Sequence, residues 1–99
     1  MVYYVYILQS VKNGQFYIGQ TQNIVKRFTD HNLGKSIFTS KNLPWNLLWY
    51  KELMSRIESY QLEQQLKRLK SRIRLIRYME ENPCVPGSEN LQISNLLDF

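Results

Sequence analysis

Residues 2–19 read VYYVYILQSVKNGQFYIG, and the fold of the chain is decided in this stretch. Its first nine residues are mostly β-branched or aromatic and place apolar side chains on both faces of an extended chain, which predicts a central β-strand over residues 2–10. Asn13 and Gly14 form the strongest short hairpin signal, because both residue types accept a positive φ. Residues 15–19 are therefore predicted to form a second strand, antiparallel to the first.

The segment that follows the hairpin predicts a helix over residues 24–33. Asn23 is a suitable N-cap, and Gly34 is a suitable residue just beyond the C-terminus of this helix. The apolar side chains expected on its buried side are Ile24, Val25 and Phe28. Residues 35–44 are mostly polar and end in a proline, which predicts a loop.

The second half of the chain predicts one more strand and then helical structure. Residues 45–53 are rich in aromatic residues and leucines and predict a third strand. From residue 55 to about residue 81 apolar residues recur with helical spacing, at Leu62, Leu66, Leu69, Ile73 and Ile76. This spacing is compatible with one long helix or with two helices that meet near Ser71. The predicted fold is α+β, with a central three-stranded antiparallel sheet flanked by helices in the order β-β-α-β-α-(α).

Length and composition limit the chain to one domain. It has 99 residues, 43% hydrophobic and 21% charged, so a packed core is expected and wholesale disorder is not. We expect a folded domain over residues 1–82 and a tail over residues 83–99, which lacks periodicity. No run of about 18 apolar residues and no basic N-terminal segment occurs, so neither a membrane span nor a secretory signal is expected. With one cysteine, Cys84, the chain is predicted to work in the reducing cytoplasm.

The charge of the chain suits a polyanionic partner. Thirteen lysines and arginines against eight acids give a net charge of +5. Six of the eleven residues in 67–77 are basic and none is acidic, whereas residues 83–99 carry only the acids Glu89 and Asp98. A solvated helix face is the simpler explanation of such a basic run, but cations at this density without interspersed acids favour contact with phosphates.

Alternation along the two strands of the hairpin predicts which side chains share a face. With a two-residue turn, residue i pairs with residue 27 − i, and Tyr17 lies opposite Ser10. Tyr6 and Tyr17 then project on the same side as Gly19, but four residues apart, roughly 13 Å. A longer loop with another pairing would bring the two tyrosines together and keep them on that side. The opposite face is expected to be core and carries Tyr3, Val5, Ile7, Phe16 and Ile18.

Two helical patterns contain further candidate residues. Arg27 and His31 are four residues apart and share a helix face, an arrangement that by itself is typical of a solvated polar side. Glu63 lies at the margin of the apolar stripe. It is the only acid in a second row, formed by Glu63, Lys67, Lys70, Arg74 and Arg77. Two interpretations stay open for Glu63: an ordinary ion pair with Lys67, or a carboxylate among cations that holds a divalent metal against a phosphate.

Taken in order, these residues resemble the GIY-YIG nuclease superfamily. The matching elements are Tyr4-Val5-Tyr6, Tyr17-Ile18-Gly19, Arg27, His31 and Glu63, and the resemblance extends over about residues 2–80. The small stand-alone bacterial proteins of that superfamily look most similar. The sequence departs from the name motif at Tyr4, which stands where that motif has glycine, and a large residue there would narrow the substrate cleft.

The resemblance implies both a function and a set of roles. It implies an endonuclease that depends on Mg²⁺ or Mn²⁺ and hydrolyses phosphodiesters of nucleic acid, DNA ahead of RNA, in repair or processing. Carried over by motif, the catalytic residues are Tyr6, Tyr17, Arg27, His31 and Glu63, with Glu63 as the metal ligand. The cations expected to bind nucleic acid are Lys26, Lys35, Lys67, Lys70, Arg74 and Arg77. We expect the tyrosines, Arg27 and Glu63 to converge on one concave site, in a monomer or weak homodimer.

Two other classes of function are compatible with the sequence. A nucleic-acid-binding module would keep the fold and the basic surface without cutting, although a mere binder has no need for a lone acid in a basic row. A protein-interaction adaptor would use Trp45, Trp49 or the tail. Salt separates the two classes, because phosphate binding weakens steeply with salt and apolar docking does not.

Overall fold

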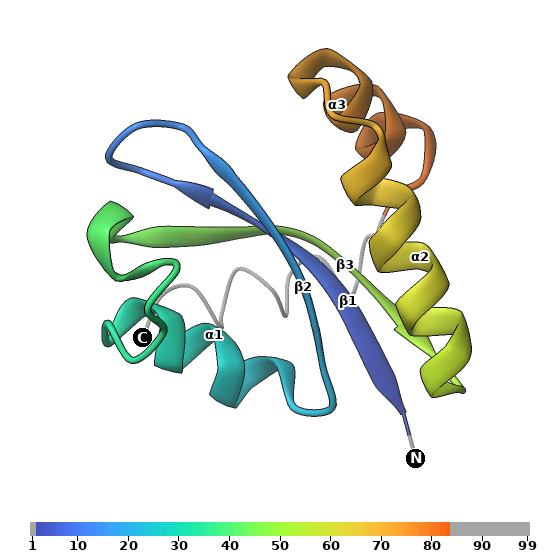
Figure 1. Ribbon diagram of the computed structural model, residues 1–99, viewed down its shortest axis with the longest axis horizontal. Helices are drawn as coiled ribbons and strands as arrows, with labels where there is room; N and C mark the ends of the chain where they lie inside the picture. The colour runs from blue at the N-terminus through green and yellow to red at the C-terminus, as the bar shows by residue number, and fades with distance from the viewer. Residues whose placement is uncertain (1, 84–99) are drawn as a thin grey trace.

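The computed structural model describes residues 2–83, which form one three-stranded antiparallel sheet and three α-helices (Figure 1). The strands are β1 (Tyr3–Ser10), β2 (Phe16–Thr21) and β3 (Trp45–Leu53), in the spatial order β2-β1-β3. The predicted α+β class, the element order and the central position of the first strand are confirmed. The predicted tail lies outside the described residues, apart from its first residue.

The pairing of β1 with β2 differs from the predicted register by two residues. Tyr6 pairs with Gly19 and Leu8 with Tyr17, so that residue i pairs with residue 25 − i. The turn is longer than two residues because the Ser10 N–H donates to the Gln15 carbonyl (2.9 Å), which leaves four residues in the connection. Since side chains alternate with a period of two, a shift of two residues leaves the predicted faces unchanged.

Helix α1 (Ile24–Asn32) packs on one face of the sheet; it begins at the predicted residue and ends one residue before the predicted end. The Asn23 side chain accepts a hydrogen bond from the Lys26 backbone N–H (3.1 Å), and Gly34 adopts a φ of +78° just beyond the helix. Phe28 is buried, but the prediction that Val25 is buried was wrong, since its side chain is 43% exposed. His31 takes the buried position one turn beyond Phe28 instead.

The helical segment after β3 is divided into α2 (Arg56–Arg68) and α3 (Arg72–Glu81). The helical conformation is interrupted at Lys70, whose φ is +47°, and the Ser71 side chain then caps the N-terminus of α3. The apolar stripe was therefore predicted wrongly beyond Leu69: Ile73 is 70% exposed, and Leu75 is the buried residue of α3. A new helix starts with its own phase, so a spacing counted through the break no longer marks one face.

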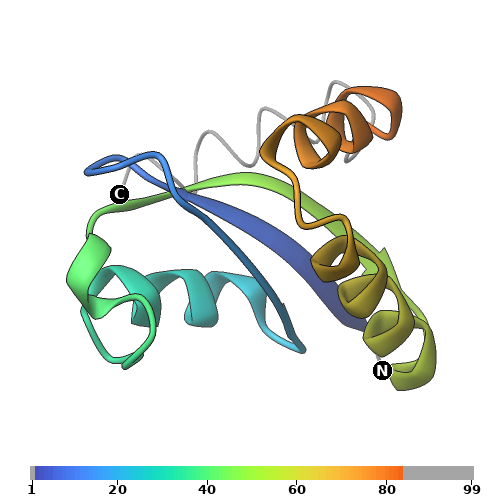
Figure 2. The same ribbon diagram turned by 45° about the horizontal axis from the view of Figure 1, so that its top comes forward.

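The sheet separates two apolar clusters, and Figures 1 and 2 show α1 on one side of the sheet with α2 and α3 on the other. The cluster toward α2 and α3 contains Val5, Ile7, Trp49, Leu62, Leu66 and Leu75. The cluster toward α1 contains Tyr6, Leu8, Phe28, Trp45 and Leu47. Both tryptophans are thus core residues, which contradicts the adaptor surface suggested for them. In the described part of the chain, no helix is long and apolar enough to cross a membrane.

Candidate active site

Tyr6 and Tyr17 lie next to one another on the α1 side of the sheet. The observed register places Tyr17 opposite Leu8, two residues from Tyr6, and the two ring centroids are 6.3 Å apart. Tyr6 is buried and Tyr17 is half-buried. The longer connection in the hairpin therefore brings together two side chains that a two-residue turn would have kept apart.

Gly19 makes room for the phenol of Tyr6. It pairs with Tyr6 across the two strands, and its φ is not in the left-handed region. A Cβ atom built on Gly19 would lie 2.5 Å from the Tyr6 hydroxyl oxygen and 3.1 Å from a ring carbon of Tyr17. The glycine is thus needed for space, because the Tyr6 ring lies directly over this point of β2.

His31 holds the Tyr6 hydroxyl from the α1 side. Its ring is fully buried; Nε2 lies 2.9 Å from the Tyr6 hydroxyl and Nδ1 lies 2.7 Å from the Thr39 hydroxyl. Burial lowers the pKa of His31 to about 4, and the positive charge of Arg27 contributes to this shift. The ring is therefore neutral at pH 7 and carries one N–H, so one ring nitrogen donates and the other accepts. His31 is not part of a solvated helix face.

Thr39 is a site residue that sequence reasoning missed. It lies in the segment between α1 and β3, is fully buried, and contacts both His31 and Trp45. The Trp45 indole N–H donates to the Thr39 carbonyl (2.9 Å), which ties this segment to the start of β3. A polar residue in a polar loop gives no sequence signal that it will be buried, and only the fold reveals the contact.

Arg27 completes the cluster on the α1 side. Its guanidinium is partly buried, which by itself lowers its pKa, but hydrogen bonding and attraction to Tyr6 and Tyr17 raise the pKa overall. Burial raises the pKa of the Tyr6 phenol far above its ordinary value, and repulsion from Tyr17 adds to this, whereas Arg27 acts in the opposite direction. At rest the site therefore contains a protonated phenol beside a permanent cation.

Glu63 approaches the same strand from the opposite face of the sheet. It lies on α2 with 8% of its surface exposed, and its Oε1 accepts a hydrogen bond from the Gln20 amide (3.0 Å). Oε2 forms an ion pair with the ammonium group of Lys67 (3.0 Å). Gln20 directly follows Gly19 on β2, the edge strand of the sheet, so Glu63 and the tyrosine cluster lie on opposite sides of this strand. The expectation that the tyrosines, Arg27 and Glu63 converge on one concave site was therefore wrong, because β2 stands between Glu63 and the other residues. The Glu63 carboxylate also disfavours ionisation of Tyr6, as the smallest of the causes that act on this phenol.

The residues around Glu63 fit a weakly held divalent cation. Within residues 2–83, no group of three or more histidine, cysteine or acidic side chains gathers to form a metal cage. Mg²⁺ keeps several waters and is typically bound through one or two carboxylates together with substrate phosphates. A single buried carboxylate, oriented by Gln20 and paired with the exposed Lys67, matches that requirement.

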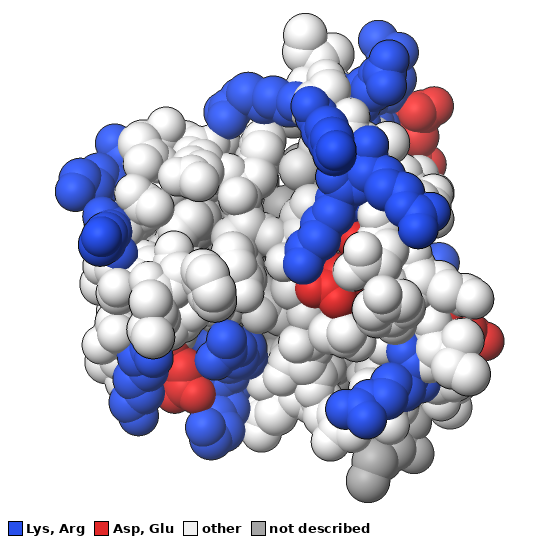
Figure 3. Space-filling model, in the orientation of Figure 1, with Lys and Arg blue, Asp and Glu red and all other residues white. Residues whose placement is uncertain are grey.

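The predicted nucleic-acid-binding cations fall into two groups (Figure 3). Lys26 and Lys35 flank Asp30 beside α1, at 3.0 and 3.7 Å. The others lie on α2, α3 and the link between them, where Figure 3 shows basic side chains gathered at the upper right around a small acidic area. They are Lys67, Lys70, Arg74 and Arg77, all exposed. Because the helix breaks at Lys70, they do not form the single helical row that was predicted.

A hollow of about 560 Å³ adjoins β2 on the side of the sheet where Glu63 lies, and it is lined by Gln20, Arg56, Ile57, Tyr60 and Gln61.

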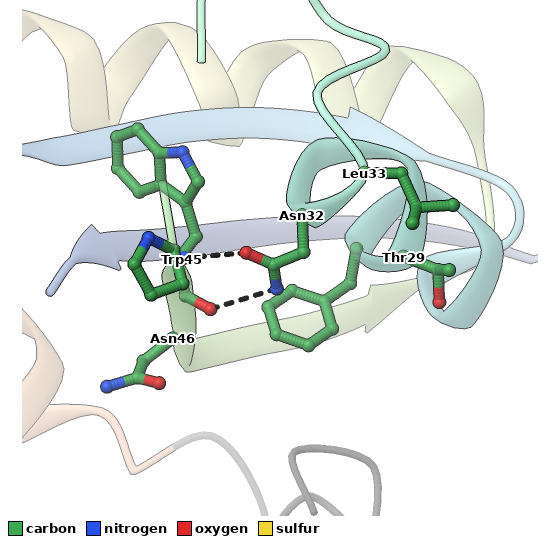
Figure 4. Close-up of a pocket in the computed structure, with 7 residues that line it drawn as sticks. Thr29, Asn32, Leu33, Trp45 and Asn46 are labelled. Atoms are coloured by element: carbon green, nitrogen blue, oxygen red, sulfur yellow. Dashed lines mark hydrogen bonds between the residues drawn. The ribbon is translucent and has the colours of Figure 1, made fainter. Parts of the chain in front are cut away.

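A second hollow, of about 370 Å³, lies between the end of α1 and the start of β3 (Figure 4). There the Asn32 side chain accepts from the Trp45 backbone N–H (2.6 Å) and donates to its carbonyl (3.0 Å). These two hydrogen bonds hold the end of α1, and with it His31, against the sheet.

The family model of the GIY-YIG catalytic domain matches residues 2–77. The chain belongs to the GIY-YIG family. That domain defines a nuclease superfamily, and the matched range contains every candidate site residue named above. The family assignment made from the ordered motifs is thereby confirmed.

Relatives of the same size support the membership in the GIY-YIG family. A UPF0213 protein of Bacillus licheniformis is 39% identical over 80 residues, which is 80% of each chain. A UPF0213 protein of Streptococcus pneumoniae is 34% identical over 80% of this chain and 79% of its own. The solution structure of a UPF0213 protein from Bacillus halodurans has a TM-score of 0.53 and 31% identity, and the match covers 87% of this chain and 89% of that one.

Titration of His31 predicts how the stability of this GIY-YIG domain depends on pH. The pKa of His31 is about 4 when folded and about 6.5 when unfolded, so the unfolded chain binds more protons between these values. The free energy of unfolding should therefore fall as the pH is lowered from about 6.5 to 4, by up to about 3 kcal/mol from this group. Urea denaturation at pH 7 and pH 5 measures the loss. The His31→Gln variant should lack the part of this loss that comes from His31. An equal loss of unfolding free energy in both proteins would contradict the lowered pKa of His31.

Proposed function

We propose that this chain is a divalent-metal-dependent endonuclease that hydrolyses phosphodiester bonds of nucleic acid, DNA ahead of RNA, in the cytoplasm of a bacterial cell. The observation that carries the proposal is the arrangement at β2. A buried phenol, a neutral histidine and an arginine meet on one side of Gly19, and an oriented carboxylate lies on the other side of the same strand.

Each side chain has a role in this reaction that its environment supports. Arg27 binds a non-bridging phosphate oxygen and neutralises the charge that develops there. Glu63 holds Mg²⁺ or Mn²⁺, which when bound supplies Lewis-acid polarisation of the phosphate and stabilises the leaving oxygen. Tyr17 is more exposed than Tyr6 and orients the attacking water. Its partner Tyr6, hydrogen-bonded to His31, fixes the geometry of the pair.

Proton balance limits the choice of base. The attacking water forms a bond to phosphorus and loses a proton, while the bond from phosphorus to the leaving oxygen breaks. A histidine with a pKa of about 4 is a weak base, and the raised pKa of Tyr6 opposes loss of the phenol proton at rest. We therefore assign His31 to the positioning of Tyr6. Tyr17 orients the attacking water, the water proton passes to solvent, and the leaving oxygen takes a proton from solvent.

The test is cleavage of a substrate panel with and without metal. Branched, nicked, duplex and single-stranded oligonucleotides are incubated with the chain in Mg²⁺, Mn²⁺ or EDTA. We expect cleavage in either metal and none in EDTA. Binding without cleavage in any metal would instead support the non-catalytic nucleic-acid-binding module, and sedimentation of the same samples tests whether the chain is a monomer or a weak homodimer.

Salt dependence tests the basic surface on α3. Replacing Arg74 and Arg77 by alanine should flatten the slope of log affinity against log salt by up to about 2 on duplex DNA, and should weaken all sequences alike, because cations on phosphates do not read bases. Lys70 is left in place because alanine is strained at its positive φ. The affinities are measured by fluorescence anisotropy in EDTA.

The matched control for this variant removes the same charge elsewhere. Lys12 and Lys51 are exposed lysines outside the predicted binding groups. Their replacement by alanine should leave the salt slope close to that of the parent. If both double variants change the slope equally, the α3 surface is an ordinary solvated face and the binding surface lies elsewhere.

A further inference from the structure

The segment between α1 and β3 presents two large apolar side chains to solvent. Ile37 is 85% exposed and Phe38 is 81% exposed, whereas the residues on either side of the pair, Ser36 and Thr39, are buried. Single exposed apolar residues are common on protein surfaces. Two consecutive ones between two buried anchors form a defined projection, which the catalytic roles described above do not use.

This projection is held firmly at its base. The Ser36 carbonyl accepts hydrogen bonds from the backbone N–H groups of Thr39 (3.3 Å) and Ser40 (2.9 Å), which closes a tight turn around the apolar pair. Thr39 is held in turn by His31 and by the Trp45 indole. The apolar pair thus belongs to an ordered turn whose anchor is part of the candidate active site.

The projection also lies close to the reacting groups. Only two short hydrogen bonds, from Thr39 to His31 (2.7 Å) and from His31 to Tyr6 (2.9 Å), separate the residue after Phe38 from the candidate phenol. The turn that carries Phe38 therefore belongs to the same hydrogen-bonded unit as the candidate phenol.

The charge around the projection suits nucleic acid. Lys35 and Lys41 bracket the apolar pair in sequence, and both are exposed. No acidic residue occurs from His31 to Lys51, and the nearest acid before this range, Asp30, is shared by Lys26 and Lys35, which leaves a net positive charge there. Aromatic rings that project between cations bind nucleic acid by stacking on bases, and stacking tolerates any sequence because every base has a π-face. A protein or lipid partner would leave unexplained why the projection is anchored on the cluster around Tyr6.

We propose that Phe38, supported by Ile37, stacks on a nucleobase of the substrate whose phosphate Arg27 binds. This inference rests on the proposed function and adds to it a base-binding contact and a substrate feature. The substrate must offer a base whose face is accessible, as at a nick, a flap, a single strand or an opened base step. The contact contributes affinity and placement of the strand, and it reads no sequence.

The test uses an oligonucleotide that carries the fluorescent base 2-aminopurine at successive positions around the cleavage site. The full chain is bound to it in EDTA, and anisotropy and 2-aminopurine quenching are measured together. We expect quenching at one or two adjacent positions. Phe38→Ala should remove that quenching and weaken binding by about 5-fold or more, in line with stacking on one base. Phe38→Tyr should keep both, and Phe38→Leu should lose the quenching.

Controls separate failure of this contact from failure of the proposed function. Thermal melting should be the same for all variants, because the side chain that is replaced is exposed. If Phe38→Ala binds and quenches like the parent, or if Phe38→Leu retains both, base stacking by Phe38 is overturned while cleavage of the substrate panel still stands. If the parent chain binds no oligonucleotide, the proposed function and this contact both fail.

Discussion

Replacing Glu63 by glutamine is expected to reduce metal-dependent cleavage by ~10²-fold or more, as removal of one oriented electrostatic group does in other active sites. Glutamine keeps an oxygen that accepts from the Gln20 amide, so the side chain stays in place, but it has no charge to hold a divalent cation. The measurement is the rate of cleavage over a titration with Mg²⁺ or Mn²⁺. Undiminished cleavage by Glu63→Gln would show that the metal is bound elsewhere.

Affinity for nucleic acid should move in the other direction in the same variant. Glu63 pairs with Lys67, and loss of its negative charge frees that ammonium group for a phosphate. Binding in EDTA should therefore be equal to that of the parent or tighter. Glu58→Gln is the matched control, because Glu58 is an exposed acid on the first turn of the same helix. It should leave both cleavage and affinity unchanged.

The faces of the hairpin could be predicted from the sequence, but its register could not. Alternation placed Tyr6, Tyr17 and Gly19 on one side, and this holds because any even shift preserves it. The register depends on the turn, and the Asn13-Gly14 signal suggested too short a connection. Ser10 competes with a two-residue turn, since its hydroxyl accepts from the backbone N–H groups of Lys12 and Asn13.

The helical half shows a similar limit. The spacing of leucines identified the buried side of α2, including the marginal position of Glu63, because that helix is continuous from Arg56 to Arg68. Beyond the positive φ of Lys70 the predicted spacing no longer marks the buried side, and Leu75 takes the place in the core that was predicted for Ile73 and Ile76. A lysine in this conformation has no signature in a single sequence, although Ser71 after it is a recognisable helix cap.

The site was predicted through motifs rather than through contacts. The order of tyrosines, arginine, histidine and glutamate indicated the family, and the family model confirmed it. The partners that orient these residues were not accessible from the sequence: His31 as a buried neutral ring, Thr39 behind it, and Gln20 on Glu63. Gln20 and Glu63 are 43 residues apart, and His31 and Thr39, although only eight apart, lie in different elements, so these contacts depend on tertiary packing that local patterns do not encode.

Replacing Gly19 by alanine is expected to reduce cleavage by ~10²-fold, the order of effect that a misplacement of about 1 Å has on a catalytic group. The new methyl group would lie 2.5 Å from the Tyr6 hydroxyl oxygen and 2.7 Å from its ring carbon, so the ring must move. Tyr6 is buried and bonded to His31, and it cannot move without losing that hydrogen bond. The overpacking should also lower the free energy of unfolding by ~1–3 kcal/mol.

A double-mutant cycle with Tyr6→Phe shows whether Gly19 acts through Tyr6. Phenylalanine lacks the hydroxyl oxygen, which is the atom nearest to the new methyl group, so the ring can shift more easily. The hydrogen bond to His31 is already absent in that background. In that background Gly19→Ala should cost much less activity than it does alone, because two residues that act through one contact are not additive. Cleavage rates of the four proteins, taken at a temperature where urea denaturation shows each to be folded, give the coupling. Equal losses in both backgrounds would mean that the glycine serves Tyr17 or the fold, and that the position of the Tyr6 hydroxyl does not limit cleavage.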